Sequence, residues 1–95
     1  MYMIEVHHHE IWRGGDKIGY IESGWIYSHE GHKLGYTEGH SIYNHDGRKV
    51  AWIDGNHVYM MDGGEHWNLD DVHEHVQASD LSDPLRAVIK LFLGD

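Results

Sequence analysis

The sequence contains no cysteine and only one proline and one phenylalanine among its 95 residues. The absence of cysteine excludes a disulfide framework and every metal site built on thiolates. No stretch approaches the ~20 apolar residues that a membrane-spanning helix needs. The N-terminus also lacks the basic region and apolar run of a secretory signal. We therefore expect a cytoplasmic protein that makes no membrane contact.

Basic residues are scarce as well. Seven Lys and Arg stand against 16 Asp and Glu, which gives a formal net charge of −9. Nucleic-acid phosphates are neutralised by clustered Lys and Arg, so we expect no direct binding to nucleic acid. Histidine, by contrast, is abundant with 11 residues, and protonation of all of them would move the charge from −9 to +2.

Three copies of one 16-residue unit follow each other without a gap, at residues 17–32, 33–48 and 49–64. They read KIGYIESGWIYSHEGH, KLGYTEGHSIYNHDGR and KVAWIDGNHVYMMDGG. Each copy has Lys first, a branched apolar residue second, a small residue third, an aromatic residue fourth and Tyr eleventh. Runs of β-branched and aromatic residues between glycines are typical of strands. The repeat therefore predicts an antiparallel meander of β-hairpins.

Two turns per unit separate the strands. Gly in a two-residue turn favours the primed turns that fit strand twist, because those turns need positive φ. The first turns are Ser23-Gly24, Gly39-His40 and Gly55-Asn56, and we interpret Glu30-Gly31, Asp46-Gly47 and Asp62-Gly63 as turns of the same kind. Two short turns per unit leave strands of about six residues.

The flanks resemble partial units, so we place a β-hairpin repeat domain at residues 1–67. A half unit on each side would make four units, and the terminal strands could pair and close a ring. Residues 68–95 form an acidic segment and a C-terminal helix. The predicted fold class is thus mainly β with one or two short C-terminal helices, and the closed four-fold arrangement is one of its two forms.

Two helices are predicted after the repeats. Leu69, Val72 and Val76 have helical spacing, with Asn68 as a possible cap. In the last segment Asp83 is a good N-cap, Pro84 suits the first helical position, and Gly94 is a natural stop. The apolar face of this helix comprises Leu85, Val88, Ile89 and Phe92. It covers an open end of the sheet or packs against another chain.

The run Gly47-Arg48-Lys49-Val50-Ala51-Trp52-Ile53 resembles the signature of the bacterial 4-fold β-flower domains. Those domains are built from short tandem units that combine glycine, small and aromatic residues in a fixed order. The resemblance covers roughly residues 11–67 and leaves out the C-terminal helices. A looser likeness to WG- and MORN-type repeats also exists. The resemblance implies a fold, and it carries no catalytic residues and no assigned function.

Histidines are the first candidates for chemistry. Imidazole and carboxylate ligands suit zinc or another divalent transition metal, and the candidate ligands are His7, His9, His73 and His75. The sequence has no HExxH motif, so the spacing is not diagnostic. The alternatives are exposed polar residues of strands and turns, or a pH-sensing role.

Two columns of the repeat could also form sites. The sixth column is acidic (Glu22, Glu38, Asp54) and offers a cation-binding rim or, more simply, solvated residues beside turns. The fourth column is aromatic (Tyr20, Tyr36, Trp52). Aromatic repeat columns commonly build a core, and a ligand platform that includes Trp25 and Trp67 is the alternative.

Residues 65–83 contain six acidic residues and no Lys or Arg, and they include Asp70, Asp71 and Glu74. Such a run is a solvated face or a mimic of nucleic-acid phosphates. No nucleophile motif and no phosphate-binding glycine loop is present, so we expect a protein that is not an enzyme. Our first hypothesis is a protein-interaction module that forms a homo-oligomer through the 84–93 helix. The alternatives are an acidic inhibitor of a nucleic-acid-binding partner, acting through residues 70–74, and a histidine-based metal-binding protein.

Overall fold

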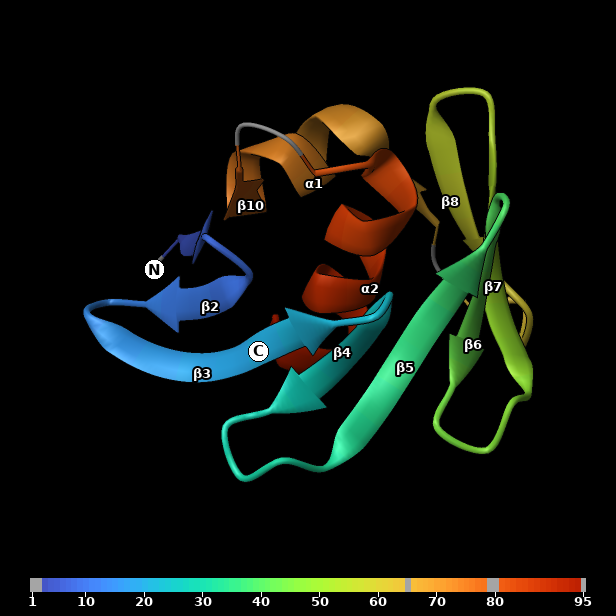
Figure 1. The fold of residues 1–95 in the computed structure, drawn as a ribbon. Helices are drawn as coiled ribbons and strands as arrows, with labels where there is room; N and C mark the ends of the chain where they lie inside the picture. The colour runs from blue at the N-terminus through green and yellow to red at the C-terminus, as the bar shows by residue number, and fades with distance from the viewer. Residues whose placement is uncertain (1–2, 65, 79–80, 95) are drawn as a thin grey trace.

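The fold is described for residues 3–64, 66–78 and 81–94 of a computed structural model, in which one ten-stranded sheet curls around a central helix (Figure 1). The strands pair in the order β10-β1-β2-β3-β4-β5-β6-β7-β8-β9, antiparallel throughout except for the parallel pair β1–β10. The elements are β1 (Ile4–His7), β2 (Glu10–Arg13), β3 (Asp16–Glu22), β4 (Trp25–Ser28), β5 (Lys33–Glu38), β6 (Ser41–Asn44), β7 (Lys49–Asp54), β8 (His57–Met60), β9 (Trp67–Asn68), α1 (Leu69–His75), β10 (Val76–Gln77) and α2 (Asp83–Leu93).

The predicted meander is confirmed, and its first turns have the expected geometry. Ser23 and Gly24 have φ of 53° and 82°, and Gly39 and Gly55 have φ of 61° and 62°. The second turns differ from the prediction. Two of them are four-residue loops, 29–32 and 45–48, and the connection from β8 to β9 is longer. All three contain a bond of one kind, such as Gly31 N–H to Ser28 O at 3.0 Å. Long strands of six or seven residues therefore alternate with short strands of four.

A β-bulge recurs where each short strand pairs with the next long strand. Ile26 pairs with Gly35 and Tyr27 pairs with Lys33, which leaves Leu34 without a cross-strand partner. Two residues on the bulged strand oppose one residue on its neighbour, and the usual alternation of faces is broken there. The same shift leaves out Ile18 and Val50 in the other units. As a result the branched residue packs inward beside the small one, while Lys and the aromatic residue share the outer face.

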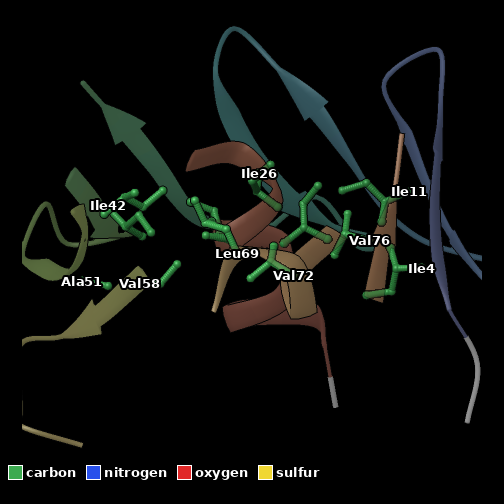
Figure 2. Packing of buried hydrophobic residues seen from close by; sticks show 13 residues of the cluster. Ile4, Ile11, Ile26, Ile42, Ala51, Val58, Leu69, Val72 and Val76 are labelled. Atoms are coloured by element: carbon green, nitrogen blue, oxygen red, sulfur yellow. The ribbon is translucent and has the colours of Figure 1, made fainter. Parts of the chain in front are cut away.

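The core lies between the inner face of the sheet and the two helices. Figure 2 shows its side chains in a continuous band that runs from Ala51 and Val58 past Leu69 and Val72 to Ile4 and Ile11. The small residues of the repeat make room for α2. A Cβ atom added to Gly35 would lie 2.5 Å from the Phe92 ring, and one added to Gly19 would lie 3.2 Å from Leu93. At Gly19 and Gly35 a side chain would therefore meet both α2 and a carbonyl oxygen of the neighbouring strand, that of Tyr27 or Tyr43.

The sheet does not close into a ring. The two edge strands of the sheet are β10, which pairs with β1, and β9, which pairs with β8. In the described part of the chain β9 and β10 do not pair with each other. The helix α1 links β9 to β10, and its buried Leu69 and Val72 fill the opening where another strand pair would stand. The closed form of the prediction is thus wrong, and an amphipathic helix takes the place of the missing strands.

Both predicted helices are confirmed, with two differences: Val76, which the spacing placed on the first helix, belongs to β10, and the cap of the second helix has changed. Asn68 caps α1, since its side-chain oxygen accepts a hydrogen bond from the Asp70 N–H at 2.9 Å. Ser82 rather than Asp83 caps α2, and Pro84 lies in the first turn. Gly94 ends α2 with its N–H bonded to Lys90 O at 3.0 Å. Neither helix has the length and apolarity that crossing a bilayer would take, within the residues described.

Candidate functional site

The predicted interaction face of α2 belongs to the chain's own core. Val88 and Ile89 are fully buried, and Leu85 and Phe92 are half-buried against the same cluster. Of the two roles open to this helix, the structure shows the covering of the sheet. Leu85 also lines a shallow groove of about 410 Å³ beside the Ser23-Gly24 turn.

The predicted acidic residues lie on the surface of α1. Asp70, Asp71 and Glu74 are all exposed. Asp70 and Asp71 are in the first turn of α1, where the partial positive charge of the helix N-terminus favours carboxylates. Their position therefore has a local structural reason, and it also leaves three carboxylates accessible on one short helix.

Three of the four candidate metal ligands have separate partners, and no partner is shared between them. His73 Nε2 lies 2.7 Å from Asp83 Oδ1, where it links α1 to α2, and His75 Nδ1 lies 2.8 Å from Asp71 O. His7 Nε2 lies 3.7 Å from Glu5 Oε1. His9 is in the β1–β2 turn with φ 75°. Among the described residues no group of three or more His, Asp or Glu side chains is arranged to hold a metal ion.

The aromatic column lies on the outer face and not in the core. Tyr20, Tyr36 and Trp52 are half-exposed, and the buried cluster contains none of them. The expectation that this column builds the core is therefore wrong, because α2 lies over the small residue of the third column and strand alternation turns the next residue to the opposite face. Each member pairs across strands with the Tyr of its own hairpin, so that the outer face carries rows of aromatic rings.

These rings stack on each other instead of lying flat on the sheet. Tyr20 stacks on Tyr27 with ring centroids 4.9 Å apart and an interplanar angle of 5°. Tyr36 stacks on Tyr43 at 4.9 Å and 13°. Trp25 adds a tilted ring to the second stack, with its centroid 4.4 Å from that of Tyr36 and an interplanar angle of 45°. Trp52 and Tyr59 repeat the arrangement at 5.4 Å. Aromatic pairs of this kind add about 0.5–1.5 kcal/mol beyond their area burial.

A lysine accompanies each stack. The Nζ atom of Lys33 lies 4.5 Å from the centroid of the Trp25 ring, and those of Lys17 and Lys49 lie 5.6 Å and 5.7 Å from Tyr20 and Trp52. These are cation–π distances. At the other end of each long strand stands the acidic column, and Glu22, Glu38 and Asp54 are exposed. The outer face, which we define by Lys17, Trp25, Lys33, Lys49 and the stacked rings with their acidic neighbours, thus carries both signs of charge around aromatic rows.

The geometry of the outer face limits what it can bind. Stacked rings cover each other's faces, so a ligand meets ring edges, phenol hydroxyls and the lysine ammonium groups. A small planar molecule would need an open ring face. An extended polar and apolar surface, such as that of another protein, matches the exposed ring edges better.

Sequence reasoning missed most of this surface. It named Tyr20, Tyr36 and Trp52 as a column, but it did not assign their stacked partners or the lysines to a site. The signal was present in the recurrence of Lys at the first position of every unit, since three equivalent lysines are not required by a hairpin. Strict alternation would place the Lys and the aromatic residue, three positions apart, on opposite faces. The bulge brings them to one face, and alternation alone does not predict it.

Comparison with known proteins bears on the repeat region. Residues 24–68 match the family model described as the 4-fold beta flower protein. The resemblance to the 4-fold β-flower family is confirmed. The β-flower match begins in the first full unit, leaves out β1–β3, and ends at the cap of α1, so the helices lie outside it as expected. No curated protein and no solved structure matched the chain.

Proposed function

We propose that this β-flower protein is a non-enzymatic protein-interaction module and that its outer face is the recognition surface. One observation carries the proposal: the repeats present stacked, half-exposed Tyr and Trp side chains on a sheet that is supported from behind by α2. Tyr and Trp are enriched among the residues that dominate interface energetics. Cross-strand stacking holds these rings in place before binding, which lowers the entropy lost on association.

A site-specific photo-crosslinker tests this proposal. A photoreactive phenylalanine analogue replaces Tyr43 in the full chain, expressed in the organism that makes it, and a second version places it at Asp62, in an exposed loop outside the stacks. We expect covalent adducts with protein from position 43 and none from position 62. Equal labelling at both positions, or no protein adduct at position 43, would refute the outer face as a recognition surface.

The acidic inhibitor is the second candidate, and the three exposed carboxylates of α1 favour it. A partner with a basic groove would meet Asp70, Asp71 and Glu74 and lose its nucleic acid. This alternative predicts photo-crosslinks from position 74 rather than position 43. It also predicts that charge reversal at the three residues abolishes capture of the partner, whereas unchanged binding would remove it.

The histidine-based metal-binding alternative stays a prediction with a direct test. His73 Nε2 lies 2.7 Å from Asp83 Oδ1. Together the two side chains offer one nitrogen and one carboxylate to a divalent ion. Elemental analysis of untagged protein purified without chelators would show stoichiometric zinc or nickel if this function is correct. A metal content well below one ion per chain would discard it.

A further inference from the structure

The central strand of the outer face, β5, carries a pattern that is complementary to itself. Its outward side chains are Lys33, Tyr36 and Glu38, because the bulge at Leu34 sends two consecutive residues inward. Read along the strand, the surface is therefore positive, aromatic and negative. We call these three residues, with the flanking rings of Trp25 and Tyr43, the β5 strip.

The bulge also centres the aromatic residue between the charges. Trp25 pairs with Tyr36 and Tyr27 pairs with Lys33, so that Lys33 lies two rungs of the ladder from Tyr36. On the other side Tyr36 pairs with Tyr43 and Glu38 pairs with Ser41, which is again two rungs. At a rise of about 3.3 Å per residue, each charge is about 7 Å from the aromatic row. A two-fold rotation about an axis through Tyr36 therefore places Lys33 opposite Glu38.

We infer that the β5 strip is an interface for a second copy of this chain, in a face-to-face, two-fold symmetric dimer. This inference rests on the proposed function of the outer face. A two-fold interface uses the same patch on both subunits, so the patch must complement itself. The β5 strip meets that condition, with Lys33 of each copy facing Glu38 of the other and the rings of Tyr36 meeting at the axis.

The shape of the sheet agrees with a contact along one strand. The sheet is convex outward where it curls around α2 (Figure 1). Two such surfaces touch along a strip, and β5 is flanked by ring contacts on both sides, at 4.4 Å from Tyr36 to Trp25 and 4.9 Å to Tyr43. The adjacent rings widen the contact into three strands.

The other long strands offer weaker versions of the pattern. In β3 the ammonium group of Lys17 is already engaged by Glu10 at 3.2 Å. In β7 the aromatic residue Trp52 pairs on one side with Ser41, so the row is one ring shorter there. Among the three long strands β5 thus presents the lysine, the acid and the complete ring row together.

Charge reversal with mixing tests the inference. We expect the wild-type chain to have twice its monomer mass in light scattering at about 0.1 mM, a concentration that detects micromolar affinity, in 0.15 M salt. Lys33→Glu and Glu38→Lys each place like charges opposite each other at two points, so each variant alone should be a monomer. An equimolar mixture of the two should regain the dimer mass as a heterodimer, and so should the double variant K33E/E38K.

Matched controls use exposed charges away from β5. Arg48→Glu and Glu74→Lys change the net charge by the same amounts as the two test variants and should keep the dimer mass. A monomeric wild type overturns the inference, as do single variants that dimerise or a mixture that stays monomeric. Recovery in the mixture also shows that both variants are folded. If position 43 crosslinks a different protein while the wild type is a monomer, the proposed function stands and the self-association falls.

Discussion

Glycine and alanine in the third column show how a single side chain sets the depth of the core. Gly19, Gly35 and Ala51 are equivalent in the repeat and all are buried. Above Gly35 lies the Phe92 ring, and beside it lies the carbonyl oxygen of Tyr43, 2.6 Å from where a Cβ would stand. The close approach of the Phe92 ring and of the Tyr43 carbonyl, and not a positive φ, is therefore the reason for glycine at position 35.

Gly35→Ala should destabilise the fold. The added methyl group meets the Phe92 ring at 2.5 Å and the Tyr43 carbonyl at 2.6 Å, and overpacking of this kind costs about 1–3 kcal/mol. Urea denaturation measures the loss. The matched control is Ala51→Gly in the third unit, where a buried methyl is removed and no clash is made. A Gly35→Ala variant as stable as the wild type would show that both the Phe92 ring and the Tyr43 carbonyl can move away from β5 without cost.

Asn68 has two roles that can be separated. Its side-chain oxygen accepts from the Asp70 N–H and from Asn56 Nδ2, both at 2.9 Å. Asn68→Ala removes the helix cap and should cost about 0.5–2 kcal/mol in thermal unfolding. Asn56→Ala leaves the cap intact and should cost less. Equal losses in the two variants would contradict the assignment of Asn68 as the principal N-cap interaction of α1.

At the scale of the element, α2 shows what sequence patterns can and cannot decide. The apolar positions, the proline and the final glycine predicted a helix over 84–93, and the structure has it at Asp83–Leu93. The same pattern could not say what the apolar face touches, because an over-apolar helix fits a neighbouring chain as well as its own sheet. Only the tertiary fold shows that Val88 and Ile89 are buried within the chain.

The burial of Ile89 gives a test at this scale. Ile89→Ala removes a fully buried side chain and should lower the free energy of unfolding by about 2–5 kcal/mol. If the residue is internal, the urea midpoint shift is the same at low and high protein concentration. A shift that shrinks as concentration rises would instead place Ile89 in an interface between chains. Leu91→Ala, at a half-buried position of the same helix, should cost less.

The sequence predicted which strands form hairpins, but it did not predict the residue-by-residue pairing between one hairpin and the next. Counting outward from a two-residue turn places Tyr20 opposite Tyr27 and Tyr36 opposite Tyr43, and the structure has both pairs. The other connection has four residues and a bulge, and neither is fixed by alternation alone, since a shift of one residue exchanges the faces. Which face of the sheet α2 covers is a matter of tertiary packing, so the aromatic column was assigned to the core although it faces outward.

The whole molecule is an incomplete ring that a helix completes. Wherever the repeat supplies full hairpins, the strands are four to seven residues long, but β9 and β10 have two residues each. The sequence of residues 68–77 encodes helix propensity and a capping Asn, and these local preferences outweigh another hairpin. Figure 1 shows α1 beside β10 at this opening. Closure could not be decided from the repeat, because it depends on the residues that depart from it.

This architecture predicts an uneven distribution of local stability. Backbone amides in β5 and β6 are held by neighbours on both sides and lie over α2, with which both strands make contact. Amides of β9 and β10 are held by two rungs each. Segments with few hydrogen bonds open without global unfolding. Native-state hydrogen exchange should therefore show the β5–β6 amides exchanging with the free energy of global unfolding, and the β9 and β10 amides exchanging several kcal/mol more easily.

The junction where α1 links β9 to β10, which we call the seam, can be probed in the same experiment. Val72→Ala removes a fully buried side chain of α1. If the seam opens independently, this change should speed exchange at β10 far more than it lowers protection at β6. Equal changes at both strands would mean that the ring and its helical closure unfold as one unit. In that case the two-residue strands would draw their stability from the packing of Leu69 and Val72 and not from their own hydrogen bonds.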